Sequence, residues 1–143
     1  MVRAGKDQRY ADGGNILAIG LTYMRDAERC EMESDYIAAE GIYRICGEMF
    51  SGLIQQKTSC EAEARGEYMH VLFRYAMLPQ VQDAEKLQYL NQAFELASRL
   101  EKETGDMEYT VAAGCIGEEM DELNKNLQKQ MEREADQEQA AIF

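Results

Sequence analysis

The sequence has one proline, no tryptophan, one histidine and no long apolar run. With a single proline, most of the chain is free of the residue that interrupts helices most strongly. Runs of valine, isoleucine and threonine, which favour strands, are also missing. No apolar stretch approaches the roughly 20 residues that a membrane span requires. These absences argue against a β-sheet protein and against a membrane-spanning one.

Basic residues are scarce relative to acidic ones. Lysine and arginine total 15 and aspartate and glutamate total 27, which gives a formal net charge of -12. Because such a charge repels phosphate backbones, we expect no direct binding of nucleic acid. If the protein has a charged partner, we expect that partner to be basic. A solvated acidic face without a partner is the alternative that the composition leaves open.

The four cysteines lack the close spacing of a zinc knuckle or of a redox-active pair. Residues 1–14 are short and polar and contain no apolar core of a signal peptide. We therefore expect a cytoplasmic protein whose cysteines stay reduced. The sequence contains no glycine-rich phosphate loop, and the cysteines are not spaced like the ligands of a cofactor. We therefore expect no cofactor.

Apolar residues instead recur at steps of three and four, which is the period of an amphipathic helix. The pattern predicts an all-α domain of about five antiparallel helices, arranged as a helical-hairpin stack or an irregular bundle. We expect a flexible N-terminus (1–14), a helical domain (15–127) and a charged helical tail that frays (128–143). The predicted helices cover 15–33, 36–54, a segment from about 58 to Pro79, 83–104, and 106–127.

Several residues have the chemistry of helix ends. The Gly13-Gly14 pair predicts a break before a first helix capped by Asn15. Thr58 and Glu61 have the spacing of a capping box at the start of the third helix. Asp83 and Asp106 are predicted N-caps, and Gly105 between two helices predicts a left-handed C-cap.

Small and aromatic residues alternate in the segment 35–46, where Ala39 is followed by Tyr43 and Cys46. This segment resembles the second helix of a tetratricopeptide repeat, with Ala27 at the small position of the first helix. Residues 87–100, which contain Ala93 and Ala97, resemble another second helix. Positions 39 and 93 are 54 apart, whereas true repeats recur about every 34 residues, so the resemblance is to a degenerate form.

The first three predicted helices are also similar to the three-helix microtubule-interacting-and-transport type of domain. Both resemblances imply the same class of function, in which a groove holds a helix or peptide of a partner. We therefore expect a non-catalytic adaptor or regulatory module that binds a protein or peptide, with no catalytic residues. Half-buried tyrosines suit the wall of such a groove, and equally suit a small bundle. The tyrosines expected to line the groove are Tyr23, Tyr43, Tyr68 and Tyr75.

The alternative is a metal-binding helical bundle, with enzymatic activity as one outcome. Glu67 and His70 are three residues apart, the spacing at which ferritin-like bundles place two ligands of one metal on one helix. Such a site also requires carboxylates from other helices, and His70 is the only histidine in the chain.

The last predicted helix also offers a surface for self-association. Met120, Leu123, Leu127 and Met131 are spaced so that they could form a short helix–helix contact. A homo-oligomer is therefore a further expectation.

Overall fold

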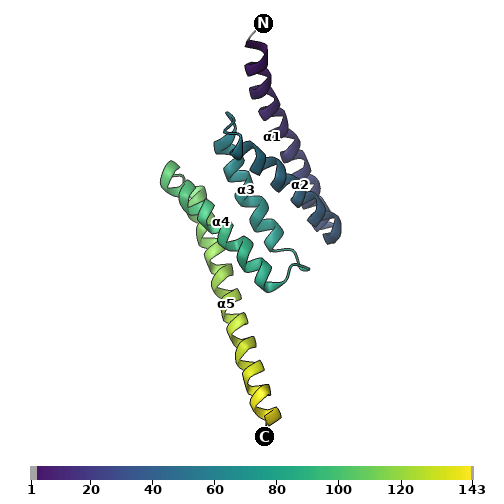
Figure 1. Ribbon diagram of the computed structural model, residues 1–143, viewed down its shortest axis with the longest axis vertical. Helices are drawn as coiled ribbons and strands as arrows, with labels where there is room; N and C mark the ends of the chain where they lie inside the picture. The colour runs from purple at the N-terminus through teal and green to yellow at the C-terminus, as the bar shows by residue number, and fades with distance from the viewer. Residues whose placement is uncertain (1–2, 143) are drawn as a thin grey trace.

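The computed structural model describes residues 3–142, with side chains from Gly13 onward, and consists of five α-helices joined by short connections (Figure 1). No strand occurs in this described range, so the predicted all-α fold is confirmed. None of its helices combines the length and apolar content needed to cross a bilayer. The helices are α1 (Arg3–Met32), α2 (Tyr36–Gln55), α3 (Glu61–Ala76), α4 (Asp83–Thr104) and α5 (Met107–Ile142).

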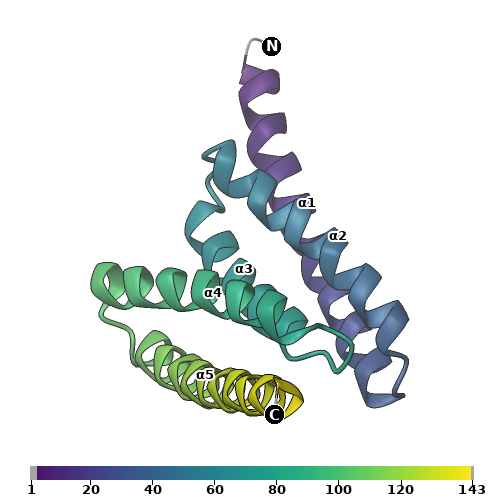
Figure 2. The same ribbon diagram turned by 60° about the horizontal axis from the view of Figure 1, so that its bottom comes forward.

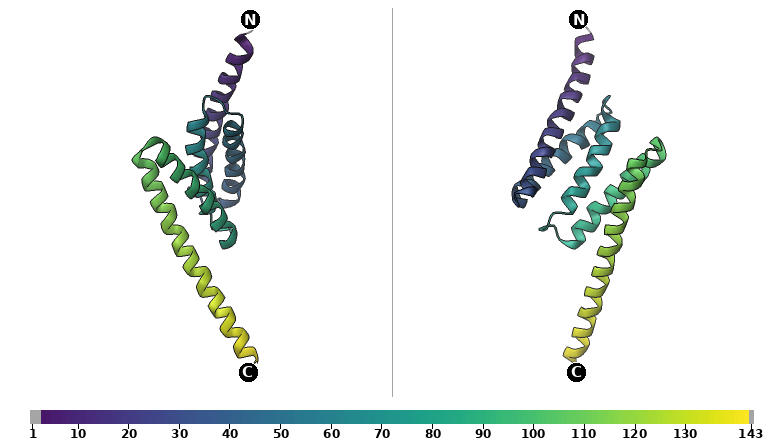
Figure 3. Two further views of the ribbon diagram at one scale, coloured as in Figure 1. Left: turned by 60° about the vertical axis from the view of Figure 1, so that its left-hand side comes forward. Right: turned by 180° about the vertical axis from the view of Figure 1, so that it is seen from behind.

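The helices form an open stack. Extensive contacts join α1 to α2, α2 to α3, α3 to α4, and α4 to α5, and the first helix has no comparable contact with the last. Figures 2 and 3 show these antiparallel neighbours side by side, and in Figure 1 the two chain ends point in opposite directions. Of the two predicted arrangements, the described helices therefore adopt the hairpin stack.

Two buried clusters hold the stack together. The first joins α1, α2 and α3, and includes Ala27, Ala39 and Tyr43. The second joins α3, α4 and α5, and includes Leu90 and Ile116. α3 supplies side chains to both clusters, so this short helix connects the two halves of the molecule.

Small side chains lie where neighbouring helices approach closely. Ala27, Ala39, Ala93 and Ala97 are fully buried, as is Cys46. The tetratricopeptide-like pattern places a small residue at Ala27, Ala39, Cys46 and Ala93, whereas Ala97 stands where the pattern has an aromatic residue. Their burial agrees with close helix packing, while membership of that family stays a prediction.

The predicted helix ends are partly confirmed. Gly105 has a φ of 68°, the left-handed conformation expected at the end of α4. The Asp106 carboxylate accepts a hydrogen bond from the backbone N–H of Glu108 at 3.1 Å, as expected of an N-cap. The predicted cap Asp83 is instead the first residue of α4.

The predicted capping box at Thr58 is wrong. α3 begins at Glu61, and Cys60 occupies the cap position without a side-chain hydrogen bond to the first turn of the helix. The Thr58 hydroxyl donates instead to the backbone carbonyl of Leu53 at 3.3 Å. This hydroxyl therefore satisfies an orphan carbonyl at the end of α2 rather than an N–H at the start of α3.

The start of α1 also differs from the prediction. The helix begins at Arg3 and continues through Gly13 and Gly14, where a break before Asn15 was expected. Residues 3–14 are thus helical, and residues 1–2 lie outside the described range. A Cβ at Gly13 would lie 3.4 Å from the Cβ of Thr58, an ordinary contact, so the loop before α3 packs beside α1 at this point.

The charged tail is a continuation of α5. Every side chain from 128 to 142 is exposed, and the helix runs unbroken to Ile142. Leu123 is buried in the second cluster, whereas Met131 is 70% exposed. The tail is therefore helical and exposed along its length, whereas its fraying and self-association along it stay predictions.

Gly20 provides a test of the packing between α1 and α2. A Cβ at Gly20 would lie 2.8 Å from Cε1 of Phe50, whose side chain is fully buried. Overpacking of this kind costs about 1–3 kcal/mol, whereas replacing a helical glycine by alanine gains up to about 1 kcal/mol. We expect Gly20→Ala to lower the free energy of unfolding by about 1–2 kcal/mol in urea denaturation.

Gly41→Ala is the matched control, because a Cβ at Gly41 meets nothing within 4 Å. This variant should be as stable as the unmodified protein or slightly more stable. Equal stabilisation by both substitutions would show that α1 and α2 do not pack as described.

Candidate functional site

An open pocket lined by four tyrosines lies where α2, α3 and α4 meet. Its volume is about 570 Å³, within the range of roughly 300–1,000 Å³ typical of ligand sites. Val71 and Leu72 of α3 contribute apolar surface. We call this feature the tyrosine pocket, after Tyr43 of α2, Tyr68 and Tyr75 of α3, and Tyr89 of α4.

The four tyrosines are exposed to different degrees. Tyr43 is fully buried and Tyr75 is only 5% exposed, so these two rings form the floor. Tyr68 and Tyr89 are half-buried and form the more accessible walls. The rings of Tyr75 and Tyr89 pack edge to face with centroids 4.9 Å apart, a favourable arrangement that ties α3 to α4.

Polar contacts fix the floor of the pocket. The Tyr43 hydroxyl donates a hydrogen bond to the Glu31 carboxylate of α1. The Tyr75 hydroxyl donates to Glu40 at 3.2 Å and accepts from Arg44 at 2.9 Å. Two of the four phenols are thus oriented by hydrogen bonds to neighbouring helices.

The pocket presents neutral phenols rather than phenolates. Burial raises the pKa of Tyr43, Tyr68 and Tyr75 above the ordinary tyrosine value. For Tyr43, the hydrogen bond to Glu31 raises the pKa further. Near neutral pH these side chains therefore keep their protons, and the negative charge beside the pocket comes from carboxylates.

Three of the four tyrosines predicted from the sequence come together in this pocket, namely Tyr43, Tyr68 and Tyr75. Tyr23 lies on α1, is 38% exposed and is not part of the pocket. Tyr89 was missed, although it lies within the repeat-like segment 87–100. Its signal is weak because it lies beside the apolar stripe of its helix rather than on it.

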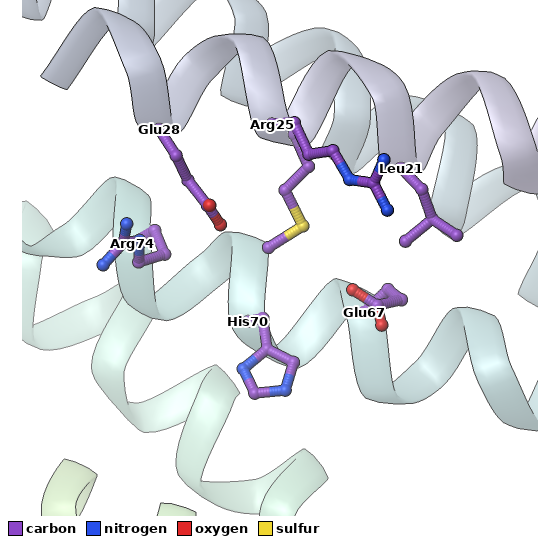
Figure 4. A pocket seen from close by; sticks show the side chains of 7 residues that line it. Leu21, Arg25, Glu28, Glu67, His70 and Arg74 are labelled. Carbon is purple, nitrogen blue, oxygen red and sulfur yellow. The ribbon is translucent and has the colours of Figure 1, made fainter. Parts of the chain in front are cut away.

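A second pocket, of about 440 Å³, lies between α1 and α3 (Figure 4). Charged side chains dominate its lining, including Arg25 and Glu28 of α1 and Glu67 and Arg74 of α3. Figure 4 shows Glu28 reaching from α1 toward α3. Charges of both signs are therefore balanced across this interface.

Glu67 and His70, the predicted metal ligands, both line this second pocket. The His70 ring points away from α1 in Figure 4, and its Nε2 lies 3.7 Å from Glu108 of α5. Within the described part of the chain, no group of three or more His, Cys, Asp and Glu side chains is placed to hold a metal ion. The pair thus lacks the additional carboxylates that a ferritin-like site requires, and the fold gives the metal alternative no support.

A third pocket, of about 290 Å³, separates α3 from α5. His70 and Glu108 border it, and its other lining is largely apolar, with Phe73 and Val111 among the side chains. Cys115 also lines it and is exposed. The open stack therefore leaves hollows on both sides of α3, of which the tyrosine pocket is the larger and the richest in aromatic rings.

Comparisons with protein families, with curated proteins and with solved structures find no match to this chain.

Glu67 allows a test of the electrostatics between α1 and α3. Burial raises the pKa of the Glu67 carboxyl; His70 opposes this effect, and the carboxylates of Glu108, Glu28 and Glu63 add to it. A carboxyl whose pKa is raised in the folded state stabilises the fold below its unfolded pKa. That contribution is lost as the pH rises through the folded pKa.

We therefore expect Glu67→Gln to increase the free energy of unfolding at pH 7 by about 0.5 kcal/mol, because the amide carries no buried charge. The difference should disappear in acid, where Glu67 is protonated. Urea denaturation at several pH values measures it, with exposed Glu122→Gln on α5 as the control. If added metal instead stabilises the unmodified protein at pH 7 and fails to stabilise Glu67→Gln, Glu67 is a metal ligand.

Proposed function

We propose that this chain is a non-catalytic binding module that holds a peptide segment of a protein partner in the tyrosine pocket. The observation that carries the proposal is the convergence of Tyr43, Tyr68, Tyr75 and Tyr89 from three helices around one open hollow. Tyrosine suits such a surface because it offers a rigid apolar ring and a polar hydroxyl at little entropic cost.

The arrangement of the helices supports this proposal. In a closed bundle the inner faces of all helices cover one another, whereas here each helix packs mainly on its neighbours in sequence. α2 and α4 therefore flank α3 and leave part of its surface open between them. The pattern of small residues in α2 and α4 resembles that of tetratricopeptide modules. Such modules bind their partners on the surfaces of stacked helices.

Filling the pocket tests the proposal. Gly47 of α2 lines the pocket, and a Cβ there would make only ordinary contacts, 3.7 Å from Val71 and 3.8 Å from Tyr68. The rest of a leucine side chain at this position must extend into the hollow. We expect peptides selected from a random displayed library on the unmodified protein to lose at least tenfold in affinity for Gly47→Leu.

Gly114→Leu on α5 is the matched control, because Gly114 is exposed and its Cβ would meet nothing within 4 Å. Both substitutions replace a helical glycine by a good helix former, so both proteins should fold. The selected peptides should bind Gly114→Leu as they bind the unmodified protein. If they bind Gly47→Leu equally well, or if selection enriches no peptide, the tyrosine pocket is not the binding site.

A further inference from the structure

Two carboxylates at the tyrosine pocket have no ion-pair partner among the side chains that the structure describes. Glu48 of α2 and Glu85 of α4 both line the pocket, from the two helices that flank α3. Among residues 13–142, whose side chains the structure describes, no lysine, arginine or histidine nitrogen lies within 4.0 Å of either carboxylate. Two uncompensated negative charges therefore face the same aromatic hollow.

Among the lining residues whose side chains the structure describes, the one cation, Arg44, already pairs with Glu40. Its guanidinium lies 3.3 Å from Glu40, donates to the Tyr75 hydroxyl, and stands 5.7 Å from the centroid of the Tyr75 ring. Arg44 thus neutralises Glu40 rather than Glu48 or Glu85. It also shows that the aromatic surface here accepts a cation at the distance of a cation–π contact.

We propose that the tyrosine pocket recognises a cationic side chain, carried by a basic segment of the partner peptide. This inference rests on the proposed function and specifies the chemistry of the partner. The side chain would lie against the half-buried rings of Tyr68 and Tyr89, with its charge between Glu48 and Glu85. The faces of tyrosine rings attract cations, and guanidinium groups in particular stack on them.

Charge complementarity selects a cation over the other occupants of this pocket. An acidic peptide would meet Glu48 and Glu85 at close range and a chain with a net charge of -12 at long range. A wholly apolar side chain in the pocket would shield the two carboxylates from water without offering either of them a hydrogen bond or an opposite charge. A basic side chain satisfies the rings and the carboxylates together.

The test uses an acetylated and amidated alanine-rich peptide with one central arginine, and the same peptide with citrulline in its place. Citrulline keeps the shape of arginine and removes its charge. The eight tyrosines and the absence of tryptophan give a sparse aromatic NMR spectrum, in which Tyr68→Phe and Tyr89→Phe assign the two walls. We expect saturable shifts of the Tyr68 and Tyr89 signals at millimolar arginine peptide, and binding of the citrulline peptide at least tenfold weaker.

Removing the carboxylates completes the test. Glu48→Gln/Glu85→Gln should weaken binding of the arginine peptide roughly fivefold to thirtyfold, as expected for two partly exposed ion pairs. Glu132→Gln/Glu138→Gln changes the net charge equally on the exposed tail of α5 and should leave binding unchanged. Because Glu85 lies in the first turn of α4, where a negative charge favours the helix, Glu48→Gln alone provides a variant free of that effect.

Any of three results would overturn the inference. They are equal binding of the arginine and citrulline peptides, no shift of the Tyr68 and Tyr89 signals, and unchanged binding of the arginine peptide by Glu48→Gln and by Glu48→Gln/Glu85→Gln. These outcomes are distinct from failure of the proposed function. If the selected peptides lose affinity for Gly47→Leu but carry no basic residue, the proposal of a binding module stands and the proposal of a cationic ligand is wrong. If Gly47→Leu has no effect, the pocket itself is excluded.

Discussion

The buried side chain of Tyr43 joins three helices, and the shape of the tyrosine pocket depends on it. Its ring is fully buried in the cluster formed by α1, α2 and α3. Its hydroxyl donates to Glu31 of α1, and Glu31 in turn lies 3.6 Å from Arg74 of α3. A buried phenol left without an acceptor would cost about 1–3 kcal/mol, so the contact constrains where α1 can sit relative to α2. The same ring forms the floor of the pocket, which is therefore coupled to the packing of the N-terminal half.

The second structural constraint is the position of α3 between two hydrophobic clusters. Tyr75 packs with α1 and α2 in the first cluster and contacts Tyr89 of α4 across the pocket. Met69 and Leu72 of the same helix belong to the second cluster. Any rearrangement of α3 would disturb both halves at once. The walls and the floor of the pocket are thus held by the core, so the pocket is already formed in the folded chain, as the proposed binding of a peptide would favour.

Much of the fold could be predicted from the sequence, because local chemistry determines it. Gly105 ends α4 in the left-handed conformation that glycine adopts without strain, and Asp106 caps α5 through its own carboxylate. The stripe positions Ala39 and Ala93 are fully buried, as helical periodicity requires. These features depend on residues within one or two turns of one another, so a single sequence contains the information.

Features that depend on distant partners could not be predicted in this way. Gly13 lies inside α1 rather than ending it, with Thr58 of the distant loop before α3 beside it, and the Thr58 hydroxyl bonds the Leu53 carbonyl rather than capping α3. Tyr23 and Tyr89 are both aromatic residues on amphipathic helices. Only the order in which the helices stack places Tyr89 in the pocket and Tyr23 outside it.

The proposed metal pair illustrates the same limit. Glu67 and His70 have the correct spacing on α3, but a metal site also requires ligands from other helices, and spacing says nothing about those. In the folded chain His70 lies near Glu108, and Glu67 faces the charged interface with α1. The spacing of Glu67 and His70 is a property of one helix, whereas a metal site would need ligands from several helices.

The central claim is that a partner peptide occupies the tyrosine pocket of an otherwise unchanged stack. The most direct measurement is a set of intermolecular nuclear Overhauser effects between a selected, isotope-labelled peptide and the assigned tyrosine rings. The account predicts contacts from the peptide to Tyr68 and Tyr89, with none to Tyr23 on α1. Contacts confined to Tyr23, to the hollow between α3 and α5, or to the exposed tail of α5 would contradict it.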